Sequence, residues 1–229
     1  LDMDGGSDGK IESTVAGGTT NTLTVDSTSK LNGAATITTA GSQVYTGGVT
    51  LAANATLNSN INSVVGNINF GADVTGDFDL TATSTLVTFG STLGAGAEVG
   101  EVDINGNVSF AGDALVETID VSGTTNMNTA ADLIKSSGGI LKLDGTVTLA
   151  EIAGSATTYK LESTGNLTTG AIVGTAAGTA ENLTLDAGAG GVVSVGAVSL
   201  VNNILIDDAN GATFASVDLD GNFTVTDMS

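Results

Sequence analysis

The sequence predicts an all-β protein built as a parallel β-helix, that is, a β-solenoid of stacked rungs. Three observations support this prediction. Threonine, valine and glycine are abundant, with 33 glycines, whereas aromatic residues make up only 3% of the 229 residues. Short apolar–polar–apolar triplets recur along the whole chain, and proline is absent. Threonine and valine favour strands, and glycine, asparagine and aspartate favour the tight corners between them.

The triplets are the strand signal. In a strand, successive side chains point to opposite faces, so the two outer residues of each triplet share a buried face. On this basis we expect Phe70, Phe78, Phe110 and Phe223 to point into the core. Further triplets begin at Leu23, Val49, Val102, Ile119, Leu141, Tyr159, Leu183, Val198, Ile204 and Val217.

Longer repeats indicate how the strands are arranged. Glu101–Gly112, Ile140–Glu151 and Ser216–Asp227 share one pattern, in which two triplets flank an Asn-Gly or Asp-Gly pair. The triplets from Val102 to Val217 recur with a mean step of about 19 residues, which is a typical solenoid period. We therefore expect about 12 rungs of about 19 residues and a rod of about 58 Å.

A β-sandwich of hairpins is the alternative fold. Asn105-Gly106, Asp144-Gly145 and Asp220-Gly221 are strong two-residue hairpin signals. However, a hairpin at Asn105-Gly106 would place the apolar residues of its two strands on opposite faces of one sheet. A solenoid corner keeps both triplets pointing inward, so the pattern favours the solenoid. We expect residues 1–22 to form an acidic, glycine-rich segment with a first strand, and residues 23–229 to form continuous solenoid repeats.

Several segments carry a family resemblance. Gly145–Leu149 (GTVTL), Gly165–Thr169 (GNLTT) and Asn182–Asp186 (NLTLD) resemble repeats of filamentous haemagglutinin and autotransporter-passenger proteins, which are secreted β-helix proteins of cell surfaces. The resemblance implies a right-handed parallel β-helix, export to the cell surface, and a role in adhesion, biofilm or fibre formation.

Composition excludes several function classes. The chain has 25 acidic residues against five lysines, a net charge of −20, and no histidine, cysteine or arginine. A Ser-His-Asp triad, a thiol nucleophile and zinc sites of the usual ligand types are therefore excluded. The charge disfavours nucleic-acid binding, and no apolar run is long enough for a membrane-spanning helix. We expect no catalytic residues and no required cofactor.

Calcium is the one candidate ion. Asp2, Asp4 and Asp8 lie within a glycine-rich stretch and could provide oxygen ligands to Ca²⁺. The stretch does not match an EF-hand, because the position of the bidentate glutamate is occupied by Val15. A solvated terminal loop is the simpler interpretation.

Other polar groups have simpler interpretations too. Asp207-Asp208 could act as an acid–base pair on a polysaccharide, but we expect a polar corner. Lys135, Lys142 and Lys160 could pair with a neighbouring subunit, although such lysines are usually solvated. The threonine spacing of Thr36-Ile37-Thr38 resembles ice-binding arrays but does not recur from rung to rung in the sequence.

Together these features predict a secreted, extracellular, non-catalytic structural protein. It would be a rod-like adhesin segment or a self-assembling surface filament subunit, and it would associate head-to-tail because open solenoid ends expose unpaired strand edges. Host or surface glycans are further expected partners, whereas nucleic acid and membrane insertion are not. The alternatives are a polysaccharide-binding or polysaccharide-degrading β-helix module and a phage or virion fibre.

Overall fold

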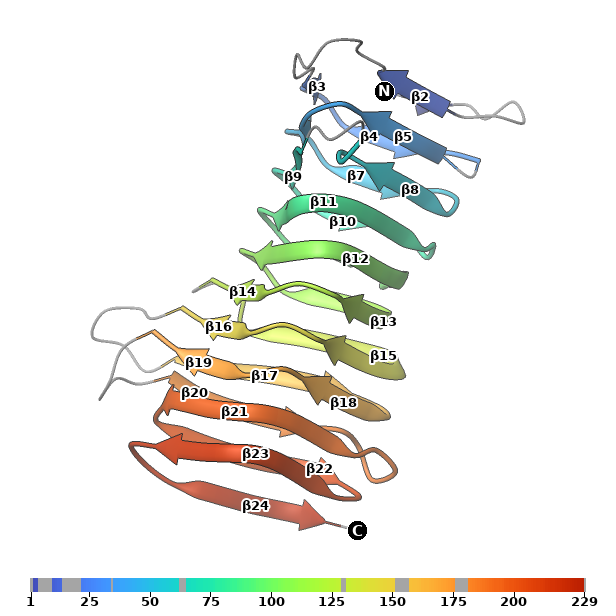
Figure 1. Cartoon of the computed structure of the whole chain (residues 1–229). Helices are drawn as coiled ribbons and strands as arrows, with labels where there is room; N and C mark the ends of the chain where they lie inside the picture. The colour runs from blue at the N-terminus through green and yellow to red at the C-terminus, as the bar shows by residue number, and fades with distance from the viewer. Residues whose placement is uncertain are drawn as a thin grey trace.

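A computed structural model shows one continuous stack of strands, with the N-terminal strands at one end and β24 (Phe223–Met228) at the other (Figure 1). The structure describes the backbone of residues 2–3 and 10–13, and residues 22–33, 35–61, 65–128, 131–150, 157–175 and 181–228. Every strand pairing within these residues is parallel. The β-solenoid is therefore confirmed, and the hairpin sandwich is wrong. In the described part of the chain no helix is long and apolar enough to cross a membrane.

The turns of the solenoid form three parallel sheets, which the chain visits in the order 1, 2, 3. In the turn between β11 and β12, sheet 1 is represented only by the bridge residue Leu93. Sheet 1 contains β1 (Asp2–Met3), β4 (Ser29–Leu31), β7 (Val49–Leu51), β10 (Val74–Thr75), the first parts of β13 (Ala114–Val121) and β15 (Leu133–Leu143), β17 (Thr157–Ser163), β20 (Glu181–Asp186), β22 (Asn203–Ala209) and β24.

Sheet 2 contains β2 (Lys10–Ser13), β5 (Ala35–Thr39), β8 (Ala55–Asn58), the first parts of β11 (Leu80–Phe89) and β12 (Val99–Phe110), the second parts of β13 and β15, β18 (Asn166–Thr169), and the first parts of β21 (Val193–Val201) and β23 (Ala212–Leu219). Sheet 3 contains β3 (Leu23–Val25), β6 (Gln43–Tyr45), β9 (Asn67–Phe70), the second parts of β11, β12, β21 and β23, β14 (Thr125–Met127), β16 (Val147–Leu149) and β19 (Ile172–Gly174).

The turns are fewer and longer than the sequence suggested. One column of paired residues in sheet 1 runs from Ser29 to Val225 in nine steps of 19 to 27 residues, with a median of 21. These nine steps span about 43 Å at the usual strand spacing. The predicted 12 rungs of about 19 residues are wrong because the triplets used as markers lie on different sheets. Val102 belongs to sheet 2, Leu183 to sheet 1 and Val217 to sheet 3.

The core fills the space between the three sheets. Alternation along each strand places apolar side chains inward, where they stack on the residue of the same column in the next turn. In sheet 2, Ile37, Leu57, Ala82, Ile104 and Val121 form such a column, and all are completely buried. Continuous burial of such columns is the main stabilising contribution in a fold of this kind.

Aromatic rings form a stack within sheet 3. Tyr45, Phe70, Phe89 and Phe110 occupy successive turns, with ring centroids 5.1 to 5.3 Å apart and nearly parallel planes. Offset stacking of this kind adds to the hydrophobic contribution of each ring. The inward placement of Phe70 and Phe110 is confirmed. That of Phe78 is wrong, because Phe78 lies in the bend before β11 and is exposed.

Polar side chains support the corners. Where the chain bends, a side-chain oxygen of one turn accepts a hydrogen bond from a backbone N–H of the next turn. Asn54 Oδ1 accepts from Asp79 N at 3.2 Å, and Asp79 Oδ1 accepts from Glu101 N at 2.9 Å. Asp144-Gly145 lies at a corner between β15 and β16, as predicted. Asn105-Gly106 lies inside β12, at the register shift where this strand passes from sheet 2 to sheet 3. Side chains thus replace the ladder hydrogen bonds that a bend interrupts.

Candidate assembly surface at the C-terminal turn

The predicted calcium ligands Asp2, Asp4 and Asp8 lie outside the residues whose side chains are described. Elsewhere, within the described residues, no group of three acidic, histidine or cysteine side chains could hold a metal ion.

Asp207 and Asp208 lie inside β22, not at a corner as predicted. The carboxylate of Asp207 lies 3.9 Å from Lys160 Nζ. Asp208 Oδ1 is buried and accepts no hydrogen bond in the structure.

Lys135, Lys142 and Lys160 pair with acidic residues of their own turn and of neighbouring turns in the same chain. Lys135 and Lys160 each lie 2.8 Å from a carboxylate oxygen of Glu162, and Lys160 also lies 2.9 Å from Asp186. Partial burial raises the pKa of Glu162, but the two lysines outweigh that effect, so the net pKa is lowered. Because Lys135, Glu162 and Asp186 occupy one column of sheet 1, these pairs connect three consecutive turns.

A second cluster connects sheet 2 across turns. Lys142 Nζ lies 2.9 Å from Asp120 and 2.8 Å from Asp144. Hydrogen bonds from Lys142 to Asp144 and then to Asp120 raise its pKa to about 12. The lysines therefore reinforce the stack of turns.

Both tyrosines are buried and unavailable as platforms for a sugar. Tyr45 donates a hydrogen bond to Gln43 Oε1 at 3.0 Å, and its burial raises its pKa well above the usual range. Tyr159 donates to the carbonyl of Ala150. Burial, followed by the charges of Glu181 and Asp132, raises the pKa of Tyr159 to about 12.

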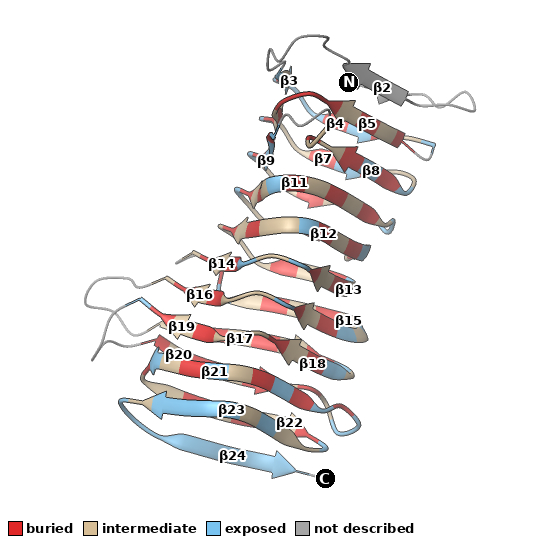
Figure 2. Cartoon of the chain, viewed as in Figure 1, coloured by how far each residue is buried: buried red, intermediate tan, exposed pale blue. Residues whose placement is uncertain are grey.

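The C-terminal turn, which consists of β23 and β24, exposes apolar residues. Phe223 and Val225 of β24 are 45% and 46% exposed, although their column neighbours Ile204 and Ile206 in β22 are almost completely buried. Figure 2 shows β24 as exposed along its length. Val217 of β23 is 40% exposed, whereas its neighbour Val198 is buried. Phe223 therefore belongs to a core column, as predicted, but is open to solvent in the last described turn.

The same turn ends the three sheets. Among the described strands, β24 pairs only with β22, and β23 pairs only with β21. Half of the backbone N–H and C=O groups of a terminal strand point away from the sheet. The C-terminal turn therefore combines an apolar surface with an unpaired parallel edge.

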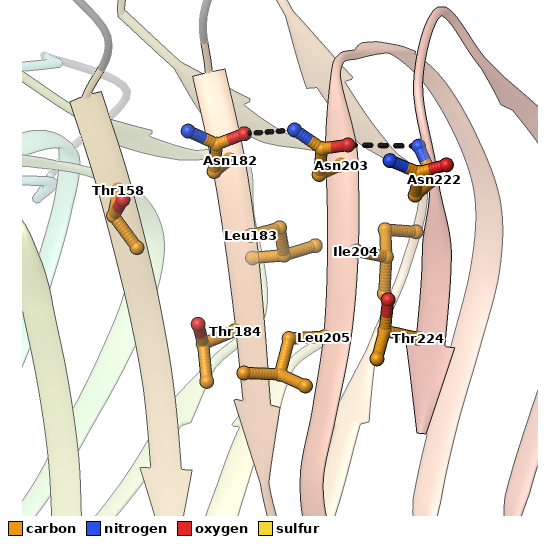
Figure 3. Close-up of a pocket in the computed structure, with 9 residues that line it drawn as sticks. All are labelled: Thr158, Asn182, Leu183, Thr184, Asn203, Ile204, Leu205, Asn222 and Thr224. Carbon is orange, nitrogen blue, oxygen red and sulfur yellow. Dashed lines mark hydrogen bonds between the residues drawn. The ribbon is translucent and has the colours of Figure 1, made fainter. Parts of the chain in front are cut away.

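A ladder of asparagines runs beside this edge and borders a hollow of about 480 Å³ (Figure 3). Asn203 Nδ2 donates to Asn182 Oδ1 at 2.7 Å, and Asn222 N donates to Asn203 Oδ1 at 2.8 Å. The hollow is also lined by uncharged residues, including Thr184, Leu205 and Thr224. The ladder thus ends at Asn222, in the exposed turn.

The sequence contains a signal for this ladder that its analysis missed. An asparagine directly precedes each of three triplets, at Asn182, Asn203 and Asn222, and the steps of 21 and 19 residues match one turn. Asparagine ladders stabilise stacks of parallel strands because each amide both donates and accepts.

The exposed turn also carries acidic residues. Asp218, Asp220 and Asp227 belong to the last turn, and no lysine follows Lys160 in the sequence. The last turn therefore combines exposed apolar residues with three acidic residues and no lysine.

Comparison with known proteins finds no matching family model, no matching curated protein and no matching solved structure. The fold alone defines the class of this chain, which is that of the parallel, three-sided β-solenoids.

Proposed function

We propose that this chain is a non-catalytic structural protein of an extracellular surface. It serves as a rigid rod, either as a segment of an adhesin stalk or as a subunit of a surface filament. In this role the rod holds its two ends apart, and the ends provide the contacts with other molecules.

The continuous stack of turns is the observation that carries the proposal. Nine register steps connect Ser29 to Val225 through parallel pairing, and the core columns run through the same turns. In such a stack every turn is fixed by the turns before and after it. A rod of this kind holds its two ends at a defined separation.

The side chains support a structural role over a carbohydrate-active one. Tyr45 and Tyr159 are buried, as are the stacked phenylalanines Phe70, Phe89 and Phe110. Lys135, Lys142 and Lys160 bind carboxylates of their own chain. These residue types would otherwise be the ones to stack on or bind a sugar.

An extracellular location is part of the proposal. The chain has no cysteine, a net charge of −20 and few aromatic residues. High negative charge keeps a large exposed β surface soluble.

Negative-stain electron microscopy of the purified chain, with calcium and with a chelator, tests the proposal. Rods at least about 43 Å long, alone or joined into filaments, are expected. Filaments that disappear with chelator would assign calcium to the joints. Compact globules would contradict the proposal, and so would specific hydrolysis of a polysaccharide by the purified chain.

A further inference from the structure

We propose that the C-terminal turn is a docking surface for the first turn of a second copy of this chain, which extends all three sheets in register. This inference rests on the proposed function, since it names the partner of a rod that assembles end to end.

Burial favours another solenoid turn as the occupant. Phe223, Val225 and Val217 continue core columns in which the preceding residues are at most 1% exposed. The contact between turns that buries those residues recurs throughout the chain. A further turn that packs on β23 and β24 would bury the last residues of these columns in the same way. Packing of one turn on the next is already the main contact of this fold.

Strand direction restricts the occupant further. The open edges of β23 and β24 continue sheets in which every described pairing is parallel. Among the described strands, β1, β2 and β3 each pair with one neighbour, β4, β5 and β6, by the same parallel register, so their other edge is the complement of the edges of β23 and β24. Head-to-tail contact matches these two edges, and such a contact does not close on itself.

The asparagine ladder and the register columns predict the alignment. Along the ladder, the side-chain oxygens of Asn182 and Asn203 each accept a hydrogen bond from the next turn. Asn222 Oδ1 is therefore placed to accept a hydrogen bond from a backbone N–H of the docked turn. One column runs from Ser29 to Val225, and Asp2 pairs with Lys30, the residue after Ser29. Extending the register by one turn therefore places Asp2 of the second copy opposite Thr226, the residue after Val225.

Charge predicts the conditions for docking. The last turn contains Asp218, Asp220 and Asp227 and no lysine, and residues 1–31 contain five acidic residues against Lys10 and Lys30. The two ends therefore repel each other until salt screens them. Docking of a second copy is strengthened by salt, whereas docking of a basic partner would be weakened.

A disulfide trap tests the alignment. The chain contains no cysteine, so Asp2→Cys and Thr226→Cys in one chain introduce the only two thiols. Their Cα atoms should meet at about 5 Å between copies, within the range for a disulfide. Oxidised glutathione in 0.5 M NaCl should then produce a ladder of multimers on a non-reducing gel, and far less of it at low salt.

Controls separate this alignment from random collision. Each single-cysteine variant can form at most a dimer. Asp2→Cys with Thr184→Cys places the second thiol on the same sheet but two turns away from the open end, and should produce no ladder. Equal ladders from both double variants would overturn the proposal.

A variant of the docking surface provides a second test. Val225→Asp should abolish salt-promoted association in sedimentation velocity, with an unchanged circular dichroism spectrum. Val65→Asp, at a residue that is 70% exposed elsewhere, should leave association intact. Individual rods that neither cross-link nor associate with salt would overturn the docking proposal and leave the rod function standing, whereas compact globules in electron micrographs would contradict both.

Discussion

Single residues at the corners decide how closely successive turns approach. Gly106 has a φ of +148°, and a Cβ placed on it would lie 1.9 Å from the carbonyl oxygen of Ser84 in the previous turn. Only glycine combines this backbone conformation with so close a contact.

Gly106→Ala should lower the free energy of unfolding by about 2–3 kcal/mol, because the added methyl forces the turns apart and the backbone is strained. Urea unfolding measures the loss. Gly190→Ala is the matched control, since no atom lies within 4 Å of its Cβ position and its φ is not positive. Equal stability of the two variants would show that the corner tolerates a side chain.

Burial separates phenylalanines that share the same local pattern. Phe89 is buried between Phe70 and Phe110, whereas Phe78 is 39% exposed. Phe89→Ala should cost about 3–5 kcal/mol through lost burial and the cavity that remains. We expect Phe78→Ala to cost less than about 1 kcal/mol. Thermal unfolding of the two variants side by side would contradict this account if Phe78→Ala were the more damaging.

Between strands, charged side chains stabilise the pairing of neighbouring turns at one place and destabilise it at another. Glu162 lies between two lysines of sheet 1, and its pKa is lowered. A carboxyl group whose pKa is lower in the folded chain stabilises the fold above its unfolded pKa, and this contribution disappears as the pH falls through the folded value.

Glu162→Gln should therefore destabilise the chain at pH 7 by about 0.5–1 kcal/mol, the range for partly exposed ion pairs. The difference from the wild type should vanish as the pH falls toward about 2. Melting temperatures measured across this range provide the test. Asp77→Asn serves as the control, because no lysine contacts Asp77 among the described ion pairs. A pH-independent loss would assign Glu162 a packing role instead.

Asp113 and Asp132 provide the opposite case. Burial, then a hydrogen bond and the charge of Asp132, raise the pKa of Asp113, although the N–H of Leu133 donates to its Oδ1 at 3.2 Å. The folded chain holds this proton more tightly than the unfolded chain, so ionisation at neutral pH weakens the fold.

Asp113→Asn should accordingly raise the melting temperature at pH 7 and have no such effect below about pH 3, where the unfolded carboxyl is also protonated. The asparagine can still accept the hydrogen bond from Leu133. Differential scanning calorimetry at the two pH values measures the change. A lower melting temperature at pH 7 would mean that the carboxylate has a stabilising partner that outweighs Asp132.

For the molecule as a whole, stability should fall from the middle of the rod toward the open end. Interior turns are bonded on both sides, whereas β24 is bonded only to β22 and its apolar side chains are exposed. A strand with one neighbour opens at lower cost than a strand with two.

Hydrogen exchange on dilute protein at low salt should therefore show the fastest strand exchange in β24 and strong protection in β12. Raising the salt concentration should slow exchange in β24 if a second copy docks there. Protection of β24 equal to that of β12 in dilute, low-salt solution would mean that its edge is already covered.

Local sequence patterns determined the class of fold. Alternation in triplets such as Val102-Asp103-Ile104 specifies which side chains are buried, and the apolar residues on both sides of Asn105-Gly106 are compatible with a solenoid corner but not with a hairpin. These features depend on neighbouring residues alone, so the all-β parallel architecture could be predicted from them. The inward positions of Phe70 and Phe110 follow from the same alternation.

Only the tertiary structure decided where each triplet lies and what surrounds it. Corners of different length make the turns unequal, so the triplets at Val102, Leu183 and Val217 belong to three different sheets although they look alike. The partners of Lys160, the asparagine ladder and the exposure of Phe223 all depend on which residues meet between turns. The lengths of all the preceding corners together determine which residues become neighbours between turns. For this reason local sequence patterns determined the solenoid, whereas the stacking of its turns determined the assembly surface.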